Sequence, residues 1–212
     1  MEDIGCNMTI INSIFPTPIY VTNLERPFNA KELQFVQEQK KHCFFNRGNN
    51  HTEDTYILNR KEFKNIKNFL EQCCKDYLEK VICPKNNLEL YITQSWLNYT
   101  EINEYHHKHD HPNSIVSGVL YIDADLKNDK ILFINGKGYQ QISPEVDDTK
   151  FNLWNSNAWS FPVKTGNLFM FPSSTAHQVE TKKGTNTRIS LSFNTFYKGT
   201  LGSNVGLTQL IL

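Results

Sequence analysis

Residues 88–100, Leu-Glu-Leu-Tyr-Ile-Thr-Gln-Ser-Trp-Leu-Asn-Tyr-Thr, mark the point at which the pattern of the chain changes. From here on, short segments rich in β-branched and aromatic residues alternate with turn-forming pairs such as Asn135-Gly136 and Thr165-Gly166, a pattern typical of successive β-strands. The predicted strands are residues 88–100, 115–123, 130–134, 158–163, 167–171 and 188–197.

The residues before position 88 predict one strand and two helices. The strand covers residues 19–21 and follows a proline-rich start. Asn29 with Glu32 three residues later predicts a capping box, and the helix that it begins carries an uneven apolar stripe over residues 33–44. Apolar residues at three- and four-residue steps predict a second helix over residues 63–81.

Two helices followed by many short strands, without strand–helix alternation, predict a mainly β fold in which the N-terminal helices back an antiparallel sandwich. A double-stranded β-helix, the jelly-roll or cupin-like arrangement of two sheets, is the natural candidate. The 212 residues suffice for a single domain. Residues 1–87 are expected to form the N-terminal strand and supporting helices, 88–200 the jelly-roll core and 201–212 a tail.

The composition limits the kinds of binding partner that we expect. Lys plus Arg equal Asp plus Glu at 22 each, so the net charge is zero and a nucleic-acid-wrapping surface is not expected. The start does not have the pattern of a signal peptide, and the apolar runs are too short for a membrane span. We therefore expect a cytoplasmic protein of a bacterium or an infected host cell. Five cysteines without a C-x-x-C pair are expected to be reduced thiols.

Four of the seven histidines lie between positions 106 and 111, which is the densest chemical signal in the chain. In an extended backbone, residues i and i+2 share a face, so His107, His109 and His111 could point together. Imidazole suits iron, zinc, copper or nickel, and any adjacent pair of these side chains could hold one such metal. The alternative is a solvated loop that happens to be rich in histidine.

A second signal lies towards the C-terminus. Residues 166–172 predict a turn and a strand, His177 follows, and Arg188 and Ser190 come eleven and thirteen residues later. Arg188 and Ser190 share a strand face, and a buried guanidinium binds a carboxylate best, through two parallel hydrogen bonds. An isolated strand arginine is more often part of a structural ion pair, but a metal-ligand candidate at this spacing favours ligand binding.

Together these features resemble the superfamily of 2-oxoglutarate and iron(II)-dependent oxygenases. There a two-ligand motif on an early jelly-roll strand, a distal histidine and an R-x-S strand form the reaction centre. More narrowly, the chain resembles a group of 2-oxoglutarate/Fe(II) oxygenases of marine bacteria and phages. The matching segments are residues 15–20, 95–98, 109–114, 117–121, 171–173 and 188–194.

The resemblance implies that His109 and His177 are iron ligands and that Arg188 and Ser190 bind the distal carboxylate of 2-oxoglutarate. A further set of candidates for co-substrate binding consists of Tyr99, Tyr121 and Asn98.

The middle ligand departs from the superfamily, whose usual triad has two histidines and one carboxylate. The matching position here is His111. His111 could serve as a third neutral ligand, which we favour. Alternatively, the loop could bend so that Asp110 reaches the metal, or water could fill the position.

The resemblance implies a non-haem Fe(II) dioxygenase that uses 2-oxoglutarate and O2, with ascorbate as an optional reductant, and hydroxylates its substrate with release of succinate and CO2. The substrate would be a small molecule or a peptidyl residue, and a homodimer would be in keeping with related proteins. The long connection over residues 135–159 is expected to border the substrate pocket.

Two other functions fit parts of the same pattern. One is a cupin-type dioxygenase with three histidines that does not use 2-oxoglutarate, against which Arg188 argues. The other is a non-catalytic jelly-roll module with a structural metal, which would need a fourth protein ligand such as His107.

Overall fold

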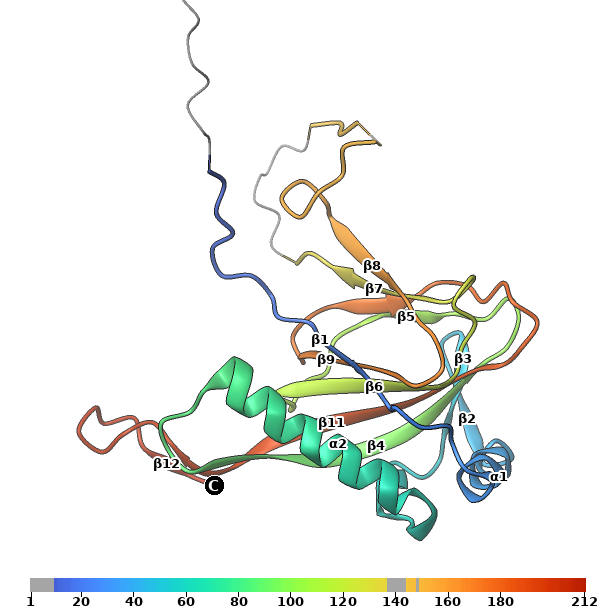
Figure 1. Ribbon diagram of the computed structural model, residues 1–212, viewed down its shortest axis with the longest axis horizontal. Coiled ribbons are helices and arrows are strands. Elements are labelled where there is room, and N and C mark those ends of the chain that lie inside the picture. The colour runs from blue at the N-terminus through green and yellow to red at the C-terminus, as the bar shows by residue number, and fades with distance from the viewer. Residues whose placement is uncertain (1–9, 137–143, 148) are drawn as a thin grey trace, which may run out of the picture.

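The computed structural model describes residues 10–136, 144–147 and 149–212 (Figure 1). These residues form two antiparallel β-sheets and two α-helices, α1 (Ala30–Gln39) and α2 (Lys64–Tyr77). The strands are β1 (Tyr20–Asn23), β2 (Cys43–Asn46), β3 (Asn49–Thr52), β4 (Leu88–Thr100), β5 (His106–His109), β6 (Val116–Asp123), β7 (Lys130–Ile134), β8 (Ala158–Pro162), β9 (Asn167–Pro172), β10 (His177–Val179), β11 (Arg188–Leu201) and β12 (Leu210–Ile211). Short helical turns at Ile57–Asn59, Lys61–Phe63 and Leu78–Ile82 complete the list.

The two sheets differ in size. The larger has eight strands in the order β1-β9-β6-β11-β4-β3-β2, with β12 paired to β11, and the smaller has the order β5-β10-β7-β8. Figure 1 shows α2 lying across the outer face of the larger sheet, while the smaller sheet lies on the opposite side. The mainly β fold with two helices and antiparallel sheets is thus as predicted.

Period-two alternation along β11 separates the two faces of the larger sheet. Ile189, Leu191 and Phe193 point into a core that also contains the buried residues of both helices. Arg188 and Ser190 point to the other face, towards the smaller sheet. A second core fills the space between the sheets and contains Val119, Tyr121, Ile131, Phe133, Val163, Phe169 and Phe171. Polar side chains of β11 therefore face the interior between two sheets, where a ligand can be enclosed.

The first helix begins as predicted but ends earlier. The Asn29 side chain accepts a hydrogen bond from the Glu32 N–H at 3.0 Å, and the Glu32 carboxylate accepts one from the Asn29 N–H at 2.8 Å, which completes the capping box. The predicted extension to residue 44 is wrong, because Cys43–Asn46 form β2. Arg47 and Gly48 have φ of 41° and 125°, and this left-handed pair forms the tight hairpin turn to β3.

No helix in the part of the chain that the structure describes is long and apolar enough to cross a membrane. Within the same part, Cys43, Cys73, Cys74 and Cys83 are free thiols, while Cys6 lies outside the described residues.

Candidate metal centre and adjoining pocket

Three histidines meet where β5 pairs with β10. His109 on β5 is the register partner of His177 on β10, and His111 follows two residues after the end of β5. One ring nitrogen of each residue lies within 4.8 Å of those of the other two, and the Nε2 atoms of His111 and His177 are 3.4 Å apart. The structure therefore brings together the three residues that the sequence proposed as metal ligands.

Two of these rings are held in the tautomer that a metal needs. The Nδ1 of His109 lies 2.8 Å from the carbonyl oxygen of His107, and the Nδ1 of His177 lies 3.0 Å from that of Thr175. A carbonyl oxygen only accepts hydrogen bonds, so each Nδ1 carries the proton and donates it. The lone pair of each ring is then on Nε2, which is available to a metal.

The protonation of the cluster also suits metal binding. Burial, together with the neighbouring His109, lowers the pKa of His177 to about 3 and that of His111 to about 4. Burial lowers the pKa of His109 as well. All three rings are therefore neutral at pH 7, which is the state in which imidazole binds a cation.

Asp110 lies outside this group. Its side chain is exposed, and it is not a member of the group of three ligand atoms, whereas His111 is. Alternation along the chain gives the reason, because His109 and His111 face the cluster and the residue between them faces away.

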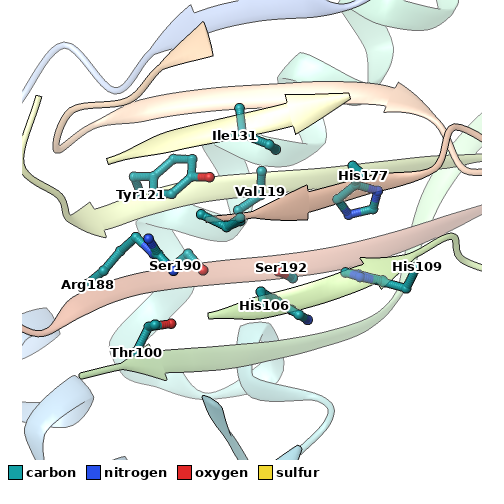
Figure 2. A pocket seen from close by; sticks show the side chains of 11 residues that line it. Thr100, His106, His109, Val119, Tyr121, Ile131, His177, Arg188, Ser190 and Ser192 are labelled. Atoms are coloured by element: carbon teal, nitrogen blue, oxygen red, sulfur yellow. The ribbon is translucent and has the colours of Figure 1, made fainter. Parts of the chain in front are cut away.

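A pocket between the sheets begins at the histidines and ends at an arginine (Figure 2). Figure 2 shows His109 and His177 at one end, and Arg188 with Tyr121 at the other. The full lining consists of Thr100, His106, His109, Val119, Tyr121, Ile131, His177, Val179, Arg188, Ser190 and Ser192. Arg188, Ser190 and Tyr121, three of the predicted co-substrate residues, thus share one pocket with two of the predicted ligands.

The arginine end of the pocket has hydrogen-bonding capacity to spare. Arg188 Nη1 donates to Asp129 Oδ1 at 3.1 Å and to the carbonyl oxygen of Glu180 at 3.5 Å. Arg188 Nη2 and the Tyr121 hydroxyl are both buried and have no hydrogen-bond partner among the described residues. Leaving such groups unsatisfied costs about 1–3 kcal/mol each, more for a charged one. A ligand carboxylate would accept from both, so the pocket fits an anionic group at this end.

His106 lines the same pocket, and the sequence did not assign it a role. Alternation would point His106 away from His109, because the two are three residues apart. However, β5 is irregular here. His177 pairs with His109 and Val179 pairs with His106, so a separation of two residues on β10 corresponds to three residues on β5. This bulge brings both rings to one face, where they stack with centroids 4.5 Å apart.

Two candidates do not line the pocket. Tyr99 points to the opposite face of β4, where its hydroxyl donates to the carbonyl oxygen of Val36 at 2.6 Å within the helix-side core. The predicted co-substrate role of Tyr99 is therefore corrected, since Thr100 occupies the pocket-facing position. Asn98 shares the face of Thr100 and donates to Oγ of the lining residue Ser192 at 2.9 Å, so it contacts the wall of the pocket without being part of the lining.

The connection over residues 135–159 contributes no described residue to this pocket. Residues 137–143 and 148 of the connection lie outside the described part of the chain. A border between this segment and a substrate stays a prediction.

A family model with the description "Putative 2OG-Fe(II) oxygenase" matches residues 94–194. The matched residues make up just under half of the chain, and over this stretch the chain resembles the 2OG-Fe(II) oxygenase family. The matched region contains every lining residue of the pocket, from Thr100 to Ser192, and all three clustered histidines. The pocket therefore lies in the part of the chain that resembles this family of oxidoreductases. A comparison with curated proteins gives no match.

Several solved structures of 2-oxoglutarate-dependent oxygenases resemble this chain in fold. A 2OG-Fe(II) oxygenase family oxidoreductase from Burkholderia pseudomallei has 14% identity and a TM-score of 0.54 over 84% of this chain and 83% of its own. A Pseudomonas putida prolyl-4-hydroxylase has 11% sequence identity and a TM-score of 0.55, and the match covers 84% of this chain and 92% of that protein. HygX from Streptomyces hygroscopicus, solved with nickel and 2-oxoglutarate bound, has 10% sequence identity and a TM-score of 0.56. The match covers 84% of this chain and 82% of HygX. At these identities the likeness establishes the fold of this chain alone.

Proposed function

We propose that this oxygenase binds Fe(II) through His109, His111 and His177 and binds 2-oxoglutarate between the metal and Arg188. The observation that carries the proposal is the layout of one pocket. Neutral imidazoles converge at one end, and at the other lies a buried guanidinium nitrogen that has no partner among residues 10–136, 144–147 and 149–212. A keto acid with a second carboxylate has matching groups, because its keto-acid end can chelate a metal while its distal carboxylate reaches a cation.

The chemistry that Fe(II), 2-oxoglutarate and O2 would supply is an oxidation in which 2-oxoglutarate becomes succinate and CO2 while a substrate C–H bond becomes C–OH. The protein's own residues position the reactants. Arg188 and the Tyr121 hydroxyl would hold the distal carboxylate, with Ser190 beside them on the same strand face. Val119 and Ile131 form apolar parts of the wall and would exclude water from the enclosed site.

An all-histidine ligand set has an electrostatic consequence. Three neutral imidazoles leave the charge of a divalent cation uncompensated, whereas two histidines and a carboxylate would neutralise half of it. The centre should therefore favour anionic ligands more strongly than the usual triad. The keto-acid end of 2-oxoglutarate is such a ligand, so both ends of the pocket would attract it.

The proposal extends to the arrangement of the two sheets, the class of substrate and the location of the protein. We propose that the two sheets form a double-stranded β-helix with residues 88–200 as its core. Likeness in fold to solved oxygenases supports this assignment. We further propose a small-molecule or peptidyl substrate and a cytoplasmic location. The named neighbours include a prolyl-4-hydroxylase and a protein solved with hygromycin B, which represent both substrate classes.

The two competing functions are less consistent with the geometry. A structural metal site with four protein ligands would need His107, which is not a member of the three-histidine group. A three-histidine dioxygenase without 2-oxoglutarate would have no use for the unpaired Arg188 Nη2 at the far end of the pocket.

The test is an anaerobic titration of apo protein with Fe(II) and then 2-oxoglutarate, followed by the visible charge-transfer band of the chelate. Arg188→Ala should keep Fe(II) binding but weaken 2-oxoglutarate binding, and His177→Ala should lose the band through loss of iron. Arg60→Ala serves as the matched control, since Arg60 is an exposed arginine paired with Asp54 outside the pocket. Iron binding without a band in the wild type would overturn the proposal.

A further inference from the structure

Arg188 belongs to a buried cluster of three charges. Asp129 lies between two cations: its Oδ1 is 3.1 Å from Arg188 Nη1 and its Oδ2 is 3.3 Å from Lys182 Nζ. The side chains of Asp129 and Lys182 have no exposed surface, and that of Arg188 is 4% exposed. Three separate segments meet here: the residue before β7, the connection after β10 and the first residue of β11.

The charges of this cluster do not cancel. Two cations and one anion give a net charge of +1, in surroundings where charge is poorly screened. Without Lys182, Asp129 and Arg188 would form a neutral pair, and the charge of Arg188 would be compensated within the protein. With Lys182 present, Asp129 is already neutralised, and the charge of Arg188 is available to a ligand.

Lys182 is held in this role by its own contacts. Its Nζ donates to Asn186 Oδ1 at 2.8 Å, and Asn186 Nδ2 donates to Asp123 Oδ1 at 2.9 Å. The backbone N–H of Lys182 donates to the carbonyl oxygen of Glu104 at 2.7 Å. The carboxylate of Asp125 is also close, but it is partly exposed to water, which screens it. Lys182 does not line the pocket, so it acts through Asp129.

Asp129 has a second effect, on geometry. It takes one guanidinium nitrogen of Arg188, Nη1, and leaves the other, Nη2, without a hydrogen-bond partner in the part of the chain that the structure describes. Asp129 is itself fixed, because its Oδ2 accepts the backbone N–H of Asp125 at 2.8 Å. The pair thus keeps the guanidinium in one orientation at the end of the pocket.

We infer that Lys182 and Asp129 determine the selectivity of the pocket for a dicarboxylic keto acid. Asp129 orients the guanidinium of Arg188, and Lys182 neutralises Asp129 so that the pocket retains one uncompensated positive charge for the distal carboxylate. Both are positioning residues. The inference rests on the proposed function, since it concerns the group that Arg188 would bind.

The experiment measures two ligands on each variant by anaerobic calorimetry with Fe(II)-loaded protein. 2-Oxoglutarate has the distal carboxylate, and 2-oxobutyrate has the same keto-acid end without it. Lys182→Met should weaken 2-oxoglutarate binding by at least about tenfold. It should leave the affinities for 2-oxobutyrate and Fe(II) within about twofold, because neither contacts the arginine end. Lys183→Met is the matched control, an exposed lysine next in sequence.

A double variant separates charge from packing. Asp129→Asn with Lys182→Met again leaves a net charge of +1, carried by Arg188 alone, and should regain most of the affinity for 2-oxoglutarate that Lys182→Met loses. If Lys182→Met binds 2-oxoglutarate like the wild type, loses both keto acids equally, or is not rescued in the double variant, the inference is overturned. Failure of the wild type to bind 2-oxoglutarate would instead overturn the proposed function.

Discussion

At the scale of single residues, the middle metal ligand separates this centre from the usual one. His111 Nε2 lies 3.4 Å from His177 Nε2, whereas the neighbouring Asp110 is exposed. His111→Ala should therefore weaken Fe(II) binding by at least about tenfold, and Asp110→Ala should change it by less than about twofold. Quenching of tryptophan fluorescence can report binding, because the rings of Trp96 and His111 have centroids 5.9 Å apart. A larger effect of Asp110→Ala would show that the loop rearranges around the metal.

Tyr99 should contribute to stability and not to co-substrate binding. Its hydroxyl donates to the carbonyl oxygen of Val36 in the helix-side core, and Tyr99→Phe would remove this buried hydrogen bond and leave that oxygen with the backbone N–H of Lys40 as its donor. We expect a loss of about 0.5–1.5 kcal/mol in the free energy of unfolding in urea, with an unchanged dissociation constant for 2-oxoglutarate. If Tyr99→Phe weakened 2-oxoglutarate binding at unchanged stability, a role of Tyr99 in the pocket would be supported instead.

The residues of the site could be predicted to different degrees. The roles of His109, His177 and Arg188 were implied by the resemblance to a known family, and the shared face of Arg188 and Ser190 followed from strand alternation. Tyr99 was assigned by resemblance, although alternation from the pocket-facing Thr100 puts it on the other face. The position of His106 could not be predicted, because no sequence pattern indicates the bulge in β5 that turns its side chain towards the pocket.

At the scale of elements, the packing of β6 against β11 depends on a glycine. Gly118 is the register partner of Phe193, and a Cβ added at position 118 would overlap the Phe193 ring, which is fully buried. Gly118→Ala should therefore lower the free energy of unfolding by about 1–3 kcal/mol. Gly136→Ala is the control, since a Cβ there would meet nothing within 4 Å. Equal stability of the two variants in urea would contradict this packing.

Elements were predictable where they carry their own apolar pattern. The strands β4 and β7 have the bounds that β-branched and aromatic residues indicated. The short strands β2, β3, β5 and β10 were missed. β3 and β5 are rich in polar residues, β10 is only three residues long, and the apolar residues at the start of β2 were assigned to the preceding helix. Their extended form depends on hydrogen bonds to neighbouring strands, which are non-local and cannot be read from local propensity.

At the scale of the whole molecule, the fold should persist without metal. Two apolar cores, one beneath the helices and one between the sheets, account for most of the buried side chains, and neither includes the three histidines. Chelation should leave the far-ultraviolet circular dichroism spectrum unchanged. Added Fe(II) at about a hundredfold its dissociation constant should stabilise the protein by about 2.7 kcal/mol. Unfolding on chelation would favour the structural-metal alternative.

The overall architecture was readable from the order of elements, since helices followed by many strands leave few arrangements in which every apolar face is buried. The pairing of β5 with β10 was not readable. It joins segments far apart in the chain, and it is this pairing that brings His109 beside His177. Only the resemblance to a known family predicted that these two histidines lie together.

The most direct test of the account is a crystal structure of the protein grown without oxygen in the presence of Fe(II) and 2-oxoglutarate. We predict one metal ion bound by the Nε2 atoms of His109, His111 and His177, with the distal carboxylate of 2-oxoglutarate accepting hydrogen bonds from Arg188 Nη2 and the Tyr121 hydroxyl. A metal bound by Asp110 or His107, or a 2-oxoglutarate molecule that does not reach Arg188, would contradict the account.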